Sequence, residues 1–204
     1  MIFLALAYWG RWISHPAAAL NILGVDLPEY VKFVPEVRYG VIPVNRLVFF
    51  GPPVALAAGL ILFASLQSRL HVAFRILAGV LAVPVALSML PPAWTPGVLM
   101  TSEFRVQTIL IMTLVGATFL IPLWKAILPD WLRGILFILL ALLNIPAIQA
   151  FRTLLPALEK LYNKPLHAGP GMIFLVIGIG LMLVAGGMMS IQPLWGLRNS
   201  KPGD

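Results

Sequence analysis

Long apolar segments separated by short polar links are the dominant pattern along this chain. Two of them, residues 48–66 and 72–90, are joined by the basic link 67–71. Each is close to the roughly 20 apolar residues that an α-helix needs to cross a bilayer. Neither contains Asp, Glu or Lys, and Arg75 lies near a segment end where its side chain can reach the headgroups. The two segments predict a hairpin of membrane-spanning helices.

Three later segments have the same apolar character. Residues 108–128, 134–151 and 172–190 are each predicted to cross the membrane. Residues 2–9 are apolar but short, which predicts a shallowly inserted or short first helix. The expected fold is therefore all-α: a polytopic integral membrane helix bundle with five spans and a possible short helix before them.

The length suits one domain. We expect residues 1–204 to form a single membrane domain, in which 1–47 is a short helix plus an external or interfacial segment and 48–204 is the helix bundle. The links at 67–71 and 129–133 and the polar tail should share one side of the membrane. Basic residues are spread almost evenly over the two sides, so the positive-inside rule does not fix the orientation.

The most polar region lies between the first apolar run and residue 46. Asp26 is placed to cap a helix that Pro28 can begin, and Glu29 follows the cap by three residues. Apolar residues then recur at helical spacing at Leu27, Tyr30, Val31 and Val34. This pattern predicts an amphipathic helix near 27–34 that ends at Pro35 and lies along the membrane surface.

Composition leads to the same class of protein. Of the 204 residues, 60% are hydrophobic and 10% are charged, whereas a soluble domain carries about 25% charged residues. We therefore expect the lipid bilayer to surround much of the chain. The formal charge of +7 does not indicate nucleic-acid binding, because the basic residues are scattered among the links. There is no cysteine, so disulfides and thiolate metal sites are excluded.

Small residues recur at regular spacing in three of the predicted spans. Such stripes let helix backbones approach closely in a membrane, so they predict packing faces rather than chemistry. The positions are Gly51, Ala55 and Gly59; Ala78, Ala82 and Ala86; and Gly171, Gly178 and Ala185.

Polar side chains within the predicted spans are few. Asn144 and Gln149 flank Pro146 in the span 134–151, and they are candidates for the lining of a polar cavity. Hydrogen bonding between helices is the alternative interpretation. All seven carboxylates fall outside the spans, which is unlike a proton relay or a cation-coupled transporter. No motif for a metal, a cofactor or a catalytic nucleophile is present, so we expect no cofactor, no metal and no enzymatic activity.

Charged and aromatic residues alternate between residues 26 and 38. Aromatic residues surrounded by both signs of charge are typical of a protein interface, although a solvated face would show the same composition. The candidate docking residues are Asp26, Glu29, Tyr30, Lys32, Phe33, Glu36 and Arg38.

Two functions are consistent with these patterns. The first is a non-catalytic structural or accessory subunit that packs against other membrane proteins or against itself. The alternative is a carrier or channel for a neutral or lipid-like solute. The scarcity of polar residues inside the spans favours the accessory subunit. The expected location is the plasma (inner) membrane of a prokaryote.

Overall fold

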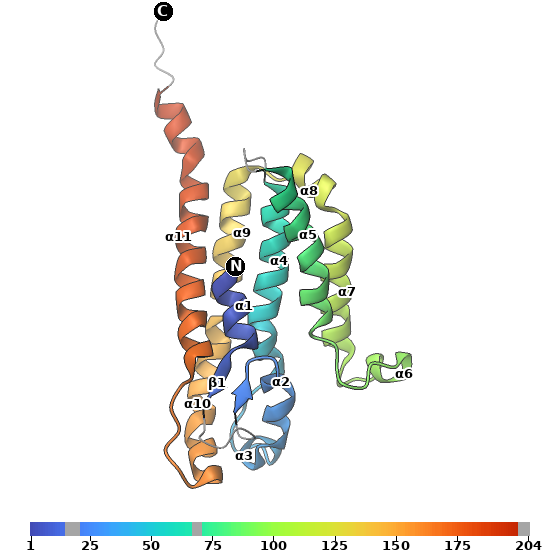
Figure 1. Cartoon of the computed structure of the whole chain (residues 1–204), viewed down its shortest axis with the longest axis vertical. Helices are drawn as coiled ribbons and strands as arrows, with labels where there is room; N and C mark the ends of the chain where they lie inside the picture. Colours follow the sequence, from blue (N-terminus) through green and yellow to red (C-terminus); the bar gives the residue numbers. More distant parts are fainter. Residues whose placement is uncertain (15–20, 67–70, 200–204) are drawn as a thin grey trace, which may run out of the picture.

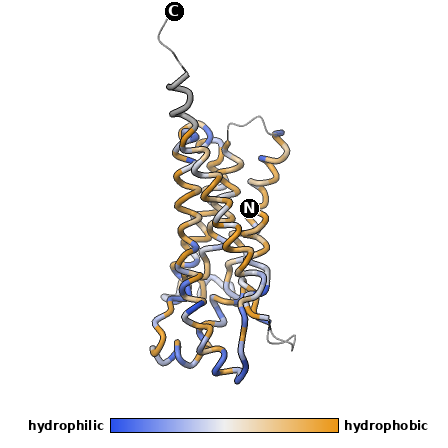
Figure 2. Tube along the Cα trace, turned by 90° about the vertical axis from the view of Figure 1, so that its left-hand side faces the viewer, coloured by the Kyte–Doolittle hydropathy of each residue, from blue (hydrophilic) through white to orange (hydrophobic). Residues whose placement is uncertain are grey.

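The computed structural model of the chain describes residues 1–14, 21–66 and 71–199, with side chains as far as residue 191. Long helices stand side by side and a cap of short elements closes one end (Figure 1). Hydropathy follows this division, since the helices are apolar along most of their length and hydrophilic residues gather at the capped end (Figure 2). We call this end the polar end.

Seven helices build the bundle. They are α4 (Gly51–Ser65), preceded by the 3-10 turn η3 (Arg46–Phe50), α5 (Val72–Leu87), α7 (Arg105–Phe119), α8 (Ile121–Ile127), α9 (Asp130–Leu142), α10 (Ile145–Tyr162) and α11 (Pro170–Asn199). Helix α4 lies near the centre and packs against α5, α8 and α9.

Three helices in the described part of the chain are long and apolar enough to cross a membrane: residues 46–65, 130–162 and 170–191. A fourth crossing is formed if α7 and α8, which meet at an angle of 71°, count as one broken span. Helix α5 is shorter, because its 16 residues rise about 24 Å against a hydrocarbon core of about 30 Å. The chain is thus a multi-pass integral membrane protein in contact with the lipid bilayer, and the structure shows three to four spans where five were predicted.

Helices α9 and α10 follow one another as a single 33-residue rod. The sequence predicted a span that ends at residue 151. At the junction, the side-chain amide of Asn144 donates to the Leu140 carbonyl at 2.8 Å, and Pro146 falls in the first turn of α10, where a missing N–H costs no hydrogen bond. A rod of this length rises about 50 Å, so α10 leaves the bilayer and becomes a wall of the polar end.

The polar end contains the only strands in the described residues. They are β1 (Arg11–Ile13) and β2 (Ile22–Leu23), paired antiparallel. The all-α prediction is corrected by this small hairpin, whose five residues are too few to give an alternating pattern. The other elements of this end are α2 (Leu27–Tyr30), η2 (Val31–Phe33), α3 (Pro35–Arg38) and α6 (Pro96–Leu99).

The short first helix predicted at residues 2–9 is confirmed as α1 (Ile2–Trp9). It lies between α4 and α11 and begins near half the height of the bundle (Figure 1). Leu4 packs on Gly178 of α11, where an added Cβ would lie 3.0 Å from the leucine side chain. Its eight residues rise about 12 Å, so α1 enters the bundle from the polar end without crossing it.

The predicted helix at 27–34 is divided into α2 and η2. Its apolar positions Leu27, Val31 and Val34 are each 1% exposed. They belong to the protein core rather than to a lipid-facing surface. Asp26 makes no side-chain capping hydrogen bond, and Pro35 begins α3 instead of ending the helical region.

Trp12 contacts several segments of the polar end. It is 1% exposed, its indole N–H donates to the Ala7 carbonyl at 2.8 Å, and its ring meets Phe151 of α10 edge-on at 5.3 Å. The backbone N–H of Gly169 donates to the Trp12 carbonyl at 2.7 Å. Segments near the two ends of the chain are thereby joined in one core.

The predicted small-residue stripes occupy mostly buried positions. All six positions of α4 and α5 are buried, as are Gly171 and Gly178. Ala185 is exposed, because the stripe faces α1 and α1 does not extend that far. The close contact between α11 and α9 is made one residue later, where a Cβ on Gly186 would lie 2.6 Å from the Gly134 carbonyl oxygen.

Candidate functional site

The residues predicted to dock a partner lie on the outside of the polar end. Burial of Leu27, Val31 and Val34 fixes α2 and η2 on the bundle, and this turns the charged residues between them outward. The structure joins these charged residues to two segments far away in sequence, η3 and the turn before α7.

Four charged residues form one connected ion network. Lys32 pairs with Glu29 and, at 2.6 Å, with Glu103, while Arg46 pairs with Glu29 at 2.8 Å. Arg46 also donates to the backbone carbonyl of Glu103 at 2.6 Å. The ring of Phe104 lies 5.1 Å from the Lys32 ammonium and 4.9 Å from the Arg46 guanidinium, within the range of cation–π attraction. We call Glu29, Lys32, Arg46, Glu103 and Phe104 the ion network.

The network shifts two pKa values in opposite directions. The hydrogen bond from Lys32 lowers the pKa of the Glu103 carboxyl. Burial alone would lower the pKa of Lys32, but its hydrogen bonds to Glu103 and Glu29 outweigh burial, so the Lys32 pKa is raised. Both shifts keep the pair charged over a wide pH range.

Sequence analysis identified Glu29 and Lys32 but not the other members of the network. Lys32 and Glu103 are 71 residues apart, and Arg46 and the Glu103 carbonyl are 57 apart. Spacing along one helix carries no information about such pairs.

The other predicted docking residues differ in their surroundings. Tyr30 is turned inward, where its hydroxyl forms a hydrogen bond with Tyr162 of α10. Burial raises the pKa of Tyr30, and this bond raises it further. Phe33 is 74% exposed, and Asp26 and Arg38 are exposed as well. Glu36 is partly buried, and its Oε2 has no hydrogen-bond partner among the described residues.

Large apolar side chains are also exposed at the polar end. In addition to Phe33, they include Tyr39, which is 79% exposed, and Val41. Trp94 and Met100, which precede and follow α6 in the chain, are exposed as well. Helix α6 projects sideways from the polar end (Figure 1). These positions lie outside the membrane-spanning helices, so hydrocarbon does not account for their exposure.

A cavity of about 370 Å³ lies beneath this surface, with Asp26, Glu29 and Phe33 among its lining residues. Tyr8, Ser88 and Gln107 also line it. The Tyr8 hydroxyl donates to the Ser88 carbonyl at 3.2 Å. Gln107 is 1% exposed and donates to the Met89 carbonyl, while its Oε1 has no partner among the described residues.

The two residues predicted to line an intramembrane cavity do not face one another. Asn144 is fully buried and its amide N–H is used within its own helix, whereas Gln149 is exposed on α10. Neither lines a cavity described in this structure. The Asn144 Oδ1, buried without a described partner, is closest to α4, because a Cβ on Gly51 would lie 3.4 Å from it.

No cluster of three or more His, Asp or Glu side chains that could hold a metal ion occurs in the described ranges 1–14, 21–66 and 71–199. The polar end carries a connected set of ion pairs and several exposed apolar side chains. The apolar helices and the polar end together make this chain a multi-pass membrane protein in which one end of the helix bundle is covered by short polar elements. Comparison with protein-family models, curated proteins and solved structures found no match.

Proposed function

We propose that this protein is a non-catalytic accessory subunit that docks another membrane protein through its polar end. One observation carries the proposal: the exposed side chains of Phe33, Tyr39 and Val41 belong to the same polar end as an ion network that is already held in place. A fixed charge pattern adds specificity, and preordered side chains lose little entropy on binding. Exposed aromatic residues supply the apolar area that dominates interface energies.

We further propose five crossings, with α5 as the fifth. Helix α5 packs along α4, and the two stand side by side over most of the bundle (Figure 1). Its outward residues Phe74, Ile76 and Val80 are exposed and apolar, as a lipid-facing surface requires. Local thinning of the bilayer accommodates a helix that is slightly short. The plasma (inner) membrane of a prokaryote remains the proposed location.

Partner capture tests the accessory-subunit proposal. The full chain would be affinity-purified in a mild detergent, and bound proteins would be quantified for the wild type and for the double variant Phe33→Ser/Tyr39→Ser. We expect the variant to lose about 90% or more of a specific partner, because aromatic anchors often contribute 2 kcal/mol or more each, roughly thirtyfold in affinity.

The control carries Lys160→Ser and Leu161→Ser, two exposed changes at the same end but on α10. It should keep the partner. A partner that is captured equally by all three proteins, or by none, would show that this surface does not dock it.

The carrier hypothesis rests on Asn144 and Gln149 and makes a separate prediction. Reconstituted protein alone should then move a solute, and Asn144→Leu should abolish the movement. Because the two side chains do not share a cavity, we rank this function second.

A further inference from the structure

The chain between α5 and α7 forms an apolar arm at the border of the polar end. Residues 91–100, which we call the arm, include α6, and this helix projects sideways from the bundle (Figure 1). None of the four residues of α6 is buried. Trp94 and Met100, which precede and follow it, are 66% and 71% exposed. The arm contains no charged residue, so its exposed surface is largely apolar.

Two buried residues of α7 fix the ends of the arm. The side-chain amide of Gln107 donates to the carbonyl of Met89, just before the arm begins. The hydroxyl of Thr108 donates to the Leu99 carbonyl at 3.0 Å. Both bonds reach backbone carbonyls, so they do not depend on which side chains the arm carries. The apolar side chains of the arm are thus held outward by the fold itself.

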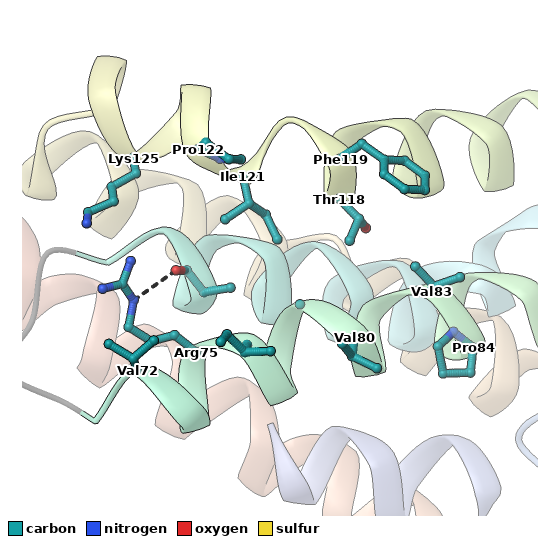
Figure 3. Close-up of a pocket in the computed structure, with 13 residues that line it drawn as sticks. Val72, Arg75, Val80, Val83, Pro84, Thr118, Phe119, Ile121, Pro122 and Lys125 are labelled. Carbon is teal, nitrogen blue, oxygen red and sulfur yellow. Dashed lines mark hydrogen bonds between the residues drawn. The ribbon is translucent and has the colours of Figure 1, made fainter.

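The arm begins and ends beside helix surfaces that face lipid. Exposed apolar residues continue along α5 as far as Leu87, its last residue, and along α7 from Val106, its second. Further from the polar end, a cavity of about 780 Å³ opens between α5 and the bent pair α7–α8, with Val80, Val83 and Phe119 among its apolar lining residues (Figure 3). This side of the bundle therefore presents apolar walls to lipid up to the point where the arm leaves it.

Charge marks the level at which the arm projects. Glu103 and Arg105 follow it directly in the chain and are both exposed, and Glu103 belongs to the ion network. The change from apolar to charged surface occurs where a bilayer passes from acyl chains to headgroups. The spanning helices cross the membrane, so a segment that projects sideways from them at this level runs along the membrane plane (Figure 1).

We propose that the arm lies in the headgroup interface of the surrounding bilayer, with Trp94 and Met100 inserted at the boundary between headgroups and acyl chains. Tryptophan is enriched at this boundary, because its ring is apolar and its indole N–H finds polar partners there. The flexible methionine side chain adapts to an irregular apolar surface. A protein partner fits less well, since the arm carries no charge that would give specificity. The proposal is independent of the accessory-subunit function, which assigns docking to Phe33 and Tyr39.

Depth-dependent fluorescence quenching tests the proposal on the full chain. Because the chain has no native cysteine, Gly97→Cys can carry a single environment-sensitive fluorophore on α6, where an added Cβ meets no atom within 4 Å. The labelled protein would be reconstituted in phosphatidylcholine vesicles whose lipids are brominated either near the headgroup or near the end of the acyl chains. We expect the fluorophore to lie about 5–10 Å into the headgroup and acyl boundary, the depth usual for interfacial segments, and to be shielded from iodide in the water.

Two other labelled positions serve as references for water and for hydrocarbon. Tyr39→Cys, 79% exposed at the polar end but outside the arm, should be quenched by iodide and not by brominated lipid. Met112→Cys, 66% exposed on α7, lies about 10 Å further along that helix than Arg105. Its fluorophore should therefore be quenched most by the deep bromines.

Removal of the two anchors separates insertion from mere proximity to the bilayer. In the labelled Gly97→Cys protein, Trp94→Ser/Met100→Ser should abolish most of the lipid quenching and make the fluorophore accessible to iodide. Phe33→Ser/Tyr39→Ser is the matched control and should leave both signals unchanged. Iodide quenching at position 97 as strong as at position 39, or lipid quenching that persists without the two anchors, would overturn the proposal. Shielding that increases with the amount of protein per lipid would also overturn it, since a second copy of the chain would then cover the arm.

Discussion

Arg133 shows how far the setting of one residue can differ from its sequence context. It follows Pro129 and Asp130 in a stretch that reads as an exposed tight turn, yet its side chain is 1% exposed. The guanidinium pairs with Asp130 and donates to the carbonyls of Trp124 and Lys125 at 3.3 and 3.2 Å. These carbonyls belong to the last turn of α8, where that of Trp124 also accepts the backbone N–H of Leu128 at 3.0 Å. A buried cation thus supports the end of α8, close to residue 128 where the sequence predicted the span to end.

The ion network makes stability depend on pH, and the sign follows from the two shifted pKa values. Because the Glu103 pKa is lowered on folding, its contribution is present above the unfolded value of 4.5 and is lost as the pH falls through the lower folded value. Because the Lys32 pKa is raised, its contribution is present below 10.5 and is lost only as the pH rises through the higher folded value.

We therefore predict that Glu103→Gln lowers the unfolding temperature at pH 7 and that its difference from the wild type disappears as the pH falls below 4.5. The expected effect is small, because exposed pairs are screened by solvent. Thermal melts from pH 3 to 9 would measure it. Equal unfolding temperatures of the variant and the wild type at pH 7, or a difference that persists unchanged at pH 3, would contradict this prediction.

At the scale of helices, the closest backbone approach is the crossing of α9 and α11. A Cβ on Gly186 would lie 2.6 Å from the Gly134 carbonyl oxygen and 2.8 Å from the Ile138 side chain. The adjacent Gly187 has no atom within 4 Å of its own Cβ position. Two neighbouring glycines therefore have opposite roles in the same helix.

Gly186→Ala should destabilise the protein by about 1–3 kcal/mol, because the added methyl group pushes two backbones apart. Gly187→Ala should be neutral or stabilising by up to about 1 kcal/mol, since alanine favours the helix. Thermal or denaturant unfolding in detergent would compare the two variants. Equal tolerance at both positions would show that this crossing is not a tight contact.

Sequence patterns predicted most of the helices but not the break between α7 and α8. The apolar runs place α4, α5 and α11 within a few residues, because helix length and hydropathy are local properties. The same runs hid the break at Leu120, although Pro122 was a signal for it. The small-residue spacing likewise identified the face of α11, but the partner of Ala185 depends on the length of another element, α1.

For the molecule as a whole, the number of crossings is the main open prediction. The ends of α4 and α8 and the starts of α5 and α9 lie together, opposite the polar end (Figure 1). This agrees with links 67–71 and 129–133 sharing one side, although residues 67–70 and the tail from 200 lie outside the described residues. If α5 crosses the membrane, its two ends face different compartments.

Single-cysteine labelling would establish this, because the chain has no native cysteine. We expect Ser102→Cys and Asn163→Cys, both exposed at the polar end, to react with a membrane-impermeant maleimide from one side. His71→Cys, exposed at the start of α5, should react only from the other. Labelling of all three positions from the same side would make α4 and α5 a re-entrant pair, and three of the five proposed crossings would remain.

The candidate site could be predicted only in part for a similar reason. Residues 26–38 were identified as a surface rich in charged and aromatic side chains, because these residues are neighbours in sequence. Arg46, Glu103 and Gln107 entered the site through tertiary packing. The cavity beneath the bend between α7 and α8 was not predicted, since its walls come from separate helices that meet only in the folded bundle.

The position of α1 has a consequence for how the protein is made. Its apolar side rests on α11, and Ile13 pairs with Ala168 just before that helix begins. About 160 residues therefore have to be translated between α1 and its main partner, which takes roughly 10–30 s at 5–20 residues per second. During that interval the face of Leu4 that packs on Gly178 of α11 in the finished structure has only lipid or the insertion machinery to cover it, although α4 is already present on another side of α1. The polar end can therefore reach its final packing only after α11 has been synthesised.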